Sequence, residues 1–334
     1  MNSVIGFFVC AAVIFFCGKK LSHYGDIIAE LTGMGKAWLG LIVLAGVTSL
    51  PELVVGYSSA AIVGSADLAV GDILGSCAFN LGLLALLDAF VPQSKPILGQ
   101  ASLSHILAAA LGIILLALVG AGMCLDRDII LIPGIGITSV GFMAIYFIAA
   151  RIIYKYNLKT PHLTVTESLE EKHSISLKKA VTLFALYAVF TVAVALFLPH
   201  FAEEIALLTG IGHSFAGTCF LAVSTSLPEI AVSIAAIRRN SIDLSVGNLL
   251  GSNMFNIFIL ALDDIFYTKG PLLKDAADAN LISVFAVIIM SAIAITGLIY
   301  KSEHKRFRMA WDAMVIFLIY IVSLVLLFYH TAGS

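Results

Sequence analysis

The sequence predicts an all-α polytopic membrane protein with ten transmembrane helices, arranged as two inverted five-helix repeats. Three observations predict this class. Of the 334 residues, 60% are hydrophobic and only 12% are charged, whereas soluble domains contain about 25% charged residues. The apolar residues gather in ten segments, most of them about 20 residues or longer, which is the length that crosses a bilayer. Two polar motifs also recur, once in each half of the chain.

The candidate spans cover approximately residues 3–31, 36–63, 67–88, 102–123, 128–155, 178–209, 213–238, 243–266, 279–300 and 308–330. The first and sixth are unusually long, and we interpret both as tilted helices with polar ends at the interface. A short span followed by an amphipathic surface helix is the alternative for each. The polar stretch 156–178 is predicted to be a cytoplasmic linker between a first repeat at 1–155 and a second at 179–334.

Lysine and arginine residues indicate the orientation of the chain. If the ten spans alternate in direction, 16 of the 19 lie on one side, and Arg127, Lys269 and Lys274 lie on the other. Because cytoplasmic connections carry the excess of these residues, we expect both termini of a cell (inner) membrane protein to be extracytoplasmic. Apart from the lipid bilayer we expect no macromolecular partner: no basic patch suits nucleic acid, and the chain is predicted to be monomeric or weakly associated.

The two halves repeat each other residue by residue. Residues 47–53 read VTSLPEL and residues 224–230 read STSLPEI, an offset of 177. Residues 70–80 read VGDILGSCAFN and residues 246–256 read VGNLLGSNMFN, an offset of 176. Five spans per half is an odd number, so the second half enters the membrane from the opposite side. Inverted repeats of this kind are typical of secondary transporters, which bind their substrates near the membrane midplane.

The first motif places a carboxylate in an apolar span. A charge there costs about 2.5–3.5 kcal/mol on insertion scales, which marks Glu52 and Glu229 as candidate functional residues. Pro51 and Pro228 each remove a backbone donor, so carbonyl oxygens around residues 45–47 and 222–224 become available as ligands. Thr48 and Glu52 are four residues apart and therefore share one helix face, with Ser49 alongside.

The second motif supplies the opposite wall of the predicted site. Ser76 and Asn80, like Ser252 and Asn256, are four residues apart, and Gly75 and Gly251 permit close helix approach. Inverted symmetry predicts that Glu52 faces Glu229, with the two asparagines between them. Oxygen ligands alone suit hard cations, and two carboxylates balance one Ca²⁺ or two Na⁺. A single Pro or Ser would indicate only a kink or a satisfied hydroxyl, but the duplicated set indicates a site.

Other acidic residues are less informative. Asp72 stands where the second half has Asn248, and it is either an N-terminal helix charge or a residue of the ion path. Span ends carry Asp67, Asp88, Asp243, Asp263 and Asp264, which we expect at the interface.

At these motifs the chain resembles the cation/calcium exchanger superfamily, specifically the sodium/calcium exchangers and their prokaryotic relatives. The resemblance rests on that family's two α-repeats, at approximately 40–85 and 217–260. It implies ion ligation by the carboxylates of Glu52 and Glu229, the hydroxyls of Thr48, Ser49, Ser76, Thr225, Ser226 and Ser252, the amides of Asn80 and Asn256, and the backbone carbonyls of Ala45 and Ala222. Some members carry Asp in place of Asn256, which leaves the number of exchanged Na⁺ ions open.

The predicted function is Na⁺/Ca²⁺ antiport by alternating access, with no enzymatic activity and no cofactor. Unpaired carboxylates are costly in low dielectric, so the empty site resists switching and bound cations permit it. The resemblance implies that the first and sixth helices slide over the core. A proton- or K⁺-coupled exchanger is the alternative, although Ser-Leu-Pro-Glu replaces the Gly-Asn-x-x-Glu motif of the proton-coupled branch. A channel is a further alternative function. A hydrolase is disfavoured because no His accompanies Ser49 or Ser226.

Overall fold

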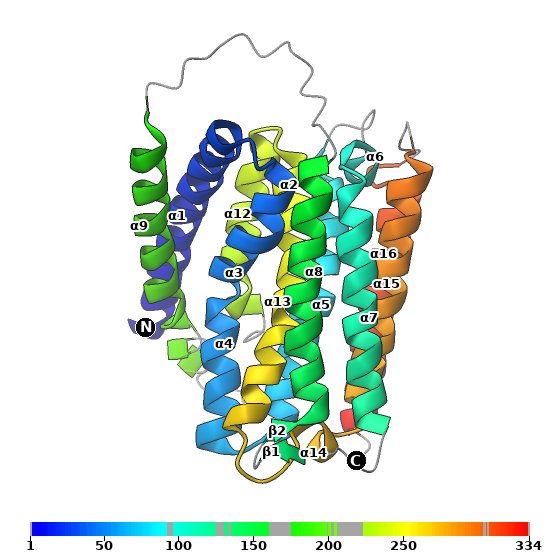
Figure 1. Ribbon diagram of the computed structural model, residues 1–334. Coiled ribbons are helices and arrows are strands. Elements are labelled where there is room, and N and C mark those ends of the chain that lie inside the picture. The colour runs from blue at the N-terminus through cyan, green and yellow to red at the C-terminus, as the bar shows by residue number, and fades with distance from the viewer. Residues whose placement is uncertain are drawn as a thin grey trace.

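The computed structural model describes residues 2–332 except 92–95, 125–129, 133–134, 160–174, 199, 202–203, 206–222, 303–304 and 306. The described chain forms a bundle of helices (Figure 1), nine of which are long and apolar enough to cross a membrane. The predicted all-α polytopic class is confirmed. The seventh predicted span, 213–238, is described only from residue 223 onward and contains helix α12 (Leu227–Arg238). The count of ten helices therefore stays a prediction.

The elements of the first half follow the predicted spans closely. They are α1 (Asn2–Thr32), α2 (Lys36–Trp38), the π-helix η1 (Leu39–Leu44), α3 (Ala45–Thr48), α4 (Leu50–Tyr57), the π-helix η2 (Ser58–Val63), α5 (Ala66–Asp88), α6 (Ile97–Gln100), α7 (Ser104–Cys124), strands β1 (Ile130–Ile132) and β2 (Ile135–Gly136), and α8 (Ile137–Lys159). Helix α1 is continuous over its 31 residues, as one long helix requires. The second predicted span is instead divided into five short helical elements.

The described elements of the second half are fewer. Besides α12 they are α9 (Leu177–Ala195), α13 (Ile242–Phe266), α14 (Leu272–Asp275), α15 (Asn280–Tyr300) and α16 (Trp311–Ala332). Elements that correspond by sequence begin at matching positions, because α7 begins at Ser104 and α15 at Asn280, again 176 residues apart.

Two predicted helix boundaries are wrong. The fifth span is predicted to begin at residue 128, but α8 begins at Ile137 and follows the small antiparallel hairpin of β1 and β2. That stretch is rich in β-branched isoleucine and contains Pro133, both of which disfavour helix. The sixth span is predicted as one helix over 178–209, but α9 ends at Ala195. The sequence carries Pro199 shortly afterwards, and a proline has no N–H to donate to the carbonyl four residues before it, here that of Ala195.

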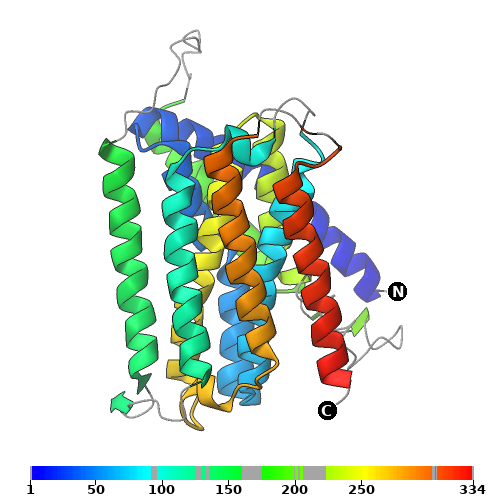
Figure 2. The same cartoon turned by 90° about the vertical axis from the view of Figure 1, so that its right-hand side faces the viewer.

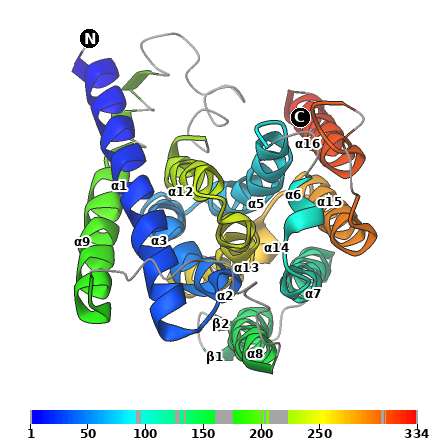
Figure 3. The same cartoon turned by 90° about the horizontal axis from the view of Figure 1, so that it is seen from above.

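Helices α5 and α13, which carry the second motif, lie at the centre of the bundle (Figure 3). Helix α13 contacts elements from both halves, including η1, α4, α5, α7, α8 and α12. Helices α8, α7, α15 and α16 stand side by side as an outer layer (Figure 2), in the order of their mutual contacts. The largest cluster of buried apolar side chains lies between this layer and the two central helices.

Helix α1 packs against α9 at one edge of the bundle, and its other face contacts α12 (Figure 3). The buried apolar side chains around this pair form two smaller clusters, separate from the main core. At the C-terminal end of α1, Asp26 pairs with Lys36 at 3.2 Å and with Arg239 at 3.0 Å. The pair of α1 and α9 thus packs around apolar clusters that also include side chains of η1, α12 and α13, and ion pairs hold it at one end.

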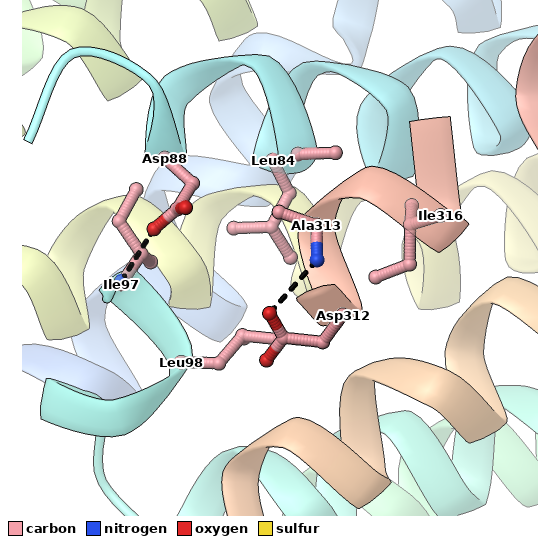
Figure 4. A pocket seen from close by; sticks show the side chains of 8 residues that line it. Leu84, Asp88, Ile97, Leu98, Asp312, Ala313 and Ile316 are labelled. Carbon is pink, nitrogen blue, oxygen red and sulfur yellow. Dashed lines mark hydrogen bonds between the residues drawn. The ribbon is translucent and has the colours of Figure 1, made fainter. Parts of the chain in front are cut away.

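Asp88 and Asp264 end the two central helices and are buried, contrary to the interfacial position predicted for them. Asp88 accepts a hydrogen bond from the backbone N–H group of Ile97 at 2.8 Å (Figure 4). It also accepts one from the N–H group of Ala310 at 2.7 Å, and it pairs with Lys305 at 3.1 Å. Asp264 accepts a bond from the N–H of Leu272 at 2.6 Å. Each carboxylate thereby holds the short helix that follows it, α6 or α14. Burial was not predictable because the partners are backbone groups of distant loops.

Glycines bring the backbone of η1 against α13. A Cβ atom on Gly40 would lie 2.6 Å from the Leu244 carbonyl oxygen, and one on Gly247 would lie 2.7 Å from the Ala37 carbonyl oxygen. A Cβ atom on Gly251 would collide with the carbonyl oxygen of Leu41. The close approach predicted at Gly251 is therefore present. For Gly75 it stays a prediction, because the counterpart of Leu41, residue 218, lies outside the described part of the chain.

We predict that Gly251→Ala lowers the free energy of unfolding by about 1–3 kcal/mol, the range for overpacking a tight contact. The opposing atom is backbone and cannot rotate away. Thermal unfolding of the purified protein in detergent measures the effect. Gly112→Ala is the matched control, because a Cβ atom there would meet Met254 Cγ at an ordinary 3.8 Å. Equal midpoints for the two variants would contradict the packing described for α13 and η1.

Candidate ion-binding site

Both Ser-Leu-Pro-Glu motifs interrupt a helix at the same residue. Ser49 has φ −88° and ψ 8°, and Ser226 has φ −83° and ψ 9°. A new helix begins directly after each serine, so Pro51 and Pro228 stand in a first turn, where a missing N–H is tolerated. Glu52 and Glu229 lie in the same first turns. The positive ends of two helix dipoles therefore point at the carboxylates.

The two motifs face each other and exchange reciprocal hydrogen bonds. The Ser49 hydroxyl donates to Glu229 Oε1 at 3.3 Å, and the Ser226 hydroxyl donates to Glu52 Oε1 at the same distance. A contact that is matched by its mirror, i with j and j with i, indicates a local two-fold relationship. Both glutamates are 1% exposed. The predicted opposition of Glu52 and Glu229 is thus the observed arrangement of the chain.

The central helices complete the enclosure. Ser252 on α13 donates to Glu229 Oε1 at 3.4 Å, and its Oγ also lies 3.4 Å from Thr48 Oγ1. Ser76 on α5 and the amides of Asn80 and Asn256 are buried, none more than 1% exposed. Side chains from α3, α4, α5, α12 and α13 consequently meet in one solvent-excluded region.

Several buried oxygens of this region have no hydrogen-bond donor among the described residues. They are the second carboxylate oxygens of Glu52 and Glu229, the hydroxyl oxygen of Ser76 and the amide oxygens of Asn80 and Asn256. Leaving a buried acceptor unsatisfied costs about 1–3 kcal/mol, more for a charged group. Oxygens that converge without donors are the ligand set of a hard cation, which takes 6–8 oxygens when it is Ca²⁺.

Fewer contacts place the remaining predicted ligands, which are Thr225 and the carbonyls of Ala45 and Ala222. Thr225 is buried, at 0% exposure, next to the break at Ser226. The Ala45 carbonyl accepts the Ser49 N–H at 3.0 Å and the Thr48 hydroxyl at 3.4 Å, so the freed carbonyl expected there is hydrogen-bonded in this arrangement. Ala222 lies outside the described residues.

Asn253 is a residue of this region that the motif comparison overlooked. Its side-chain Oδ1 accepts the Asn80 amide at 3.0 Å, and its Nδ2 donates to the Cys77 carbonyl at 3.1 Å. It thereby orients the amide of Asn80 and ties α13 to α5. By sequence Asn253 corresponds to Cys77, so the two repeats differ at this position. A search for polar residues within both copies of the Gly-Ser-x-x-x-Asn motif would have found it.

We predict that Asn253→Leu destabilises the protein by about 1–3 kcal/mol, because the Asn80 amide and the Cys77 carbonyl lose their partners in a buried region. Thermal unfolding in detergent measures the loss. The control is Asn157→Leu, whose amide makes a local bond to the Ile153 carbonyl at 3.0 Å on α8. Stability of Asn253→Leu equal to that of the control would remove Asn253 from the framework of the site.

Comparison with known proteins agrees with this geometry. The family described as sodium/calcium exchanger protein matches the chain over residues 2–196 and 179–329. The inner membrane protein YrbG of Escherichia coli is 28% identical over 253 residues, 74% of each chain. The sodium/calcium exchanger MaX1 of Methanosarcina acetivorans is 39% identical over 137 residues, which cover 39% of this chain and 36% of that protein.

A full-length likeness is found with the membrane protein MJ0091 of Methanocaldococcus jannaschii, which is 25% identical over 96% of both chains. A solved structure of the sodium-calcium exchanger NCX_Mj, soaked with Na⁺ and Ca²⁺, superposes with a TM-score of 0.74 at 23% identity, covering 97% of this chain and 98% of that one. At that identity the likeness concerns the fold. The family match covers nearly the whole sequence, and the chain is a multi-pass membrane protein that belongs to the sodium/calcium exchanger protein family.

Proposed function

We propose that this protein is a secondary active antiporter that exchanges Na⁺ for Ca²⁺ across the membrane. The observation that carries the proposal is the facing pair Glu52 and Glu229, whose second carboxylate oxygens are buried without a donor among the described residues. Membership of the exchanger family and the similarity to the sodium/calcium exchanger MaX1 support it.

The ligands of the transported ions are proposed to be the full predicted set of carboxylates, hydroxyls, amides and the carbonyls of Ala45 and Ala222. Two carboxylates confer a charge of −2, which one Ca²⁺ or two Na⁺ neutralise. Because the Ala45 carbonyl accepts both the Ser49 N–H and the Thr48 hydroxyl, it would bind an ion in exchange for the bond from that hydroxyl, which can rotate. The ions are substrates, and the two kinds compete for the same oxygens.

Exchange follows from the electrostatics of this site. The two carboxylates are both 1% exposed and lie in facing motifs that exchange hydrogen bonds, so their like charges repel across the site. In a medium of low dielectric an uncompensated pair of charges is very costly, so conformational switching requires a bound cation. Because Ca²⁺ and Na⁺ cannot occupy the same oxygens together, loading one releases the other. The result is obligatory counter-transport.

The moving element is proposed to be the pair of α1 and α9. Its apolar clusters are distinct from the main core, and its contact with α12 is apolar and includes the close packing of Gly18 against Ala231. A smooth apolar contact permits sliding with little change in buried area. The same proposal includes two inverted halves, at 1–155 and 179–334, and a cytoplasmic linker between them at 156–178. It also places both termini on the extracytoplasmic side. The reciprocal bonds of Ser49 and Ser226 support the inverted relationship.

We predict that Glu52→Gln and Glu229→Gln each reduce Na⁺-driven uptake of ⁴⁵Ca²⁺ into membrane vesicles by roughly tenfold or more, because ligand charge tunes Ca²⁺ affinity. Uptake is measured with an outward Na⁺ gradient, and again with a pH gradient or K⁺ gradient in place of Na⁺. Glu30→Gln serves as the control, because the Glu30 side chain is 46% exposed and pairs with Lys36 near the end of α1. Full uptake by both site variants would exclude the assigned ligands. Uptake driven by protons or K⁺ alone would contradict Na⁺ coupling.

A further inference from the structure

Two aspartates outside the ligand set lie on one side of the central site. Asp72 on α5 is one helical turn before Ser76, and Asp263 lies near the end of α13. The carboxylate of Asp263 lies against Gly56, where a Cβ atom would collide with it. Gly56 is one turn after Glu52 on α4, hence on the same helix face. Both aspartates are therefore displaced from the glutamates toward the same end of the bundle.

Asp263 is buried without a partner, although a span-end position predicts an interfacial carboxylate. Its side chain is 0% exposed, and neither oxygen has a hydrogen-bond donor among the described residues. The neighbouring Asp264 has three donors, from Ser139, Gly136 and Leu272. Asp72 Oδ2 is likewise buried and without a donor. No lysine, arginine or histidine of the described chain forms an ion pair with Asp72 or Asp263.

Helix α5, which carries Asp72, packs against both α4 and α13, which carry Glu52 and Asp263. The three carboxylates therefore form a series that begins at the central site and ends near the C-terminal end of α13. Such a series lowers the free energy of a cation at each step, whereas without the aspartates an ion would cross apolar surroundings between the central site and the membrane surface.

The other end of the bundle lacks this series. By the repeat offsets, Asp72 corresponds to Asn248, Gly56 to Ser233 and Asp263 to Leu87. Asn248 is neutral and satisfied, because it accepts the Thr48 hydroxyl at 3.3 Å and donates to Ser233 at 3.3 Å. The acidic series is a difference between two otherwise matched halves, and it cannot be a by-product of the repeat.

We propose that Asp263 and Asp72 form an auxiliary cation-binding step on the path between the central site and the end of the bundle at α14. Resting on the proposed function and orientation, this step lies on the extracytoplasmic side and binds Ca²⁺ before it reaches Glu52. Gly56 provides the space that the Asp263 carboxylate occupies. The matched positions of the other half, Asn248, Ser233 and Leu87, are neutral, so the two faces of the protein differ in their cation affinity.

Transport measured from each face tests the path. In Asp263→Asn, the apparent KM for ⁴⁵Ca²⁺ should rise about tenfold, equivalent to about 1.4 kcal/mol, at the extracytoplasmic face of right-side-out vesicles. At the cytoplasmic face, in inverted vesicles, it should change less than about twofold. Asp67→Asn, an exposed acid at the start of α5, is the matched control and should change neither value. An equal change at both faces, or none, would overturn the proposal.

A measurement of Ca²⁺ binding that does not require transport tests this proposal independently of the proposed function. Equilibrium dialysis of ⁴⁵Ca²⁺ is performed on the Glu52→Gln/Glu229→Gln double variant, in which the central site is disabled. We expect residual binding with a Kd of roughly 1 mM, in the range of weak exposed calcium sites. Adding Asp263→Asn should abolish it, and adding Asp67→Asn should not. Residual binding that is absent, or indifferent to Asp263, would contradict the auxiliary step, whether or not the wild type exchanges Na⁺ for Ca²⁺.

Discussion

The structure depends on one electrostatic constraint, the opposition of two carboxylates in the interior of an apolar bundle. Glu52 and Glu229 are both 1% exposed, and each receives a serine hydroxyl from the opposite half of the chain. Hydrogen bonds from three hydroxyls and two helix ends do not compensate two buried charges. In the proposed mechanism the ionised site therefore requires a cation, and this requirement couples binding to conformational change.

The surrounding fold serves to hold the broken helices in position. Irregular backbone at membrane depth is tolerated only where protein packs around it, and α13 provides that packing against η1 through Gly40, Gly247 and Gly251. Asp88 and Asp264 anchor the ends of the two central helices by backbone bonds to the following loops. In the proposed mechanism the central helices form the site-bearing part of the molecule, and the α1 and α9 pair, whose apolar clusters are distinct from the main core, forms the part that moves.

Much of this arrangement was predictable because it is encoded in repeated local motifs. An apolar segment of span length predicts a helix, and a glutamate beside a proline in such a segment predicts a helix break and a binding site. The inverted symmetry of the two repeats then predicts that Glu52 and Glu229 face each other. Features that depend on long-range partners were not predictable. The burial of Asp88 requires Lys305, and the role of Asn253 requires Asn80 on another helix. The end of α9 at Ala195 was not predicted because the residues that follow it in the sequence are also apolar.

Competition between the two cations at equilibrium tests the central claim most directly. Binding of ⁴⁵Ca²⁺ to the purified wild-type protein is measured by equilibrium dialysis at increasing Na⁺, with choline replacing Na⁺ at constant ionic strength. If both ions use the oxygens around Glu52 and Glu229, Na⁺ raises the apparent Kd for Ca²⁺ progressively while the high-affinity binding capacity stays constant. A Kd that is independent of Na⁺ would contradict a shared site and the exchange mechanism built on it.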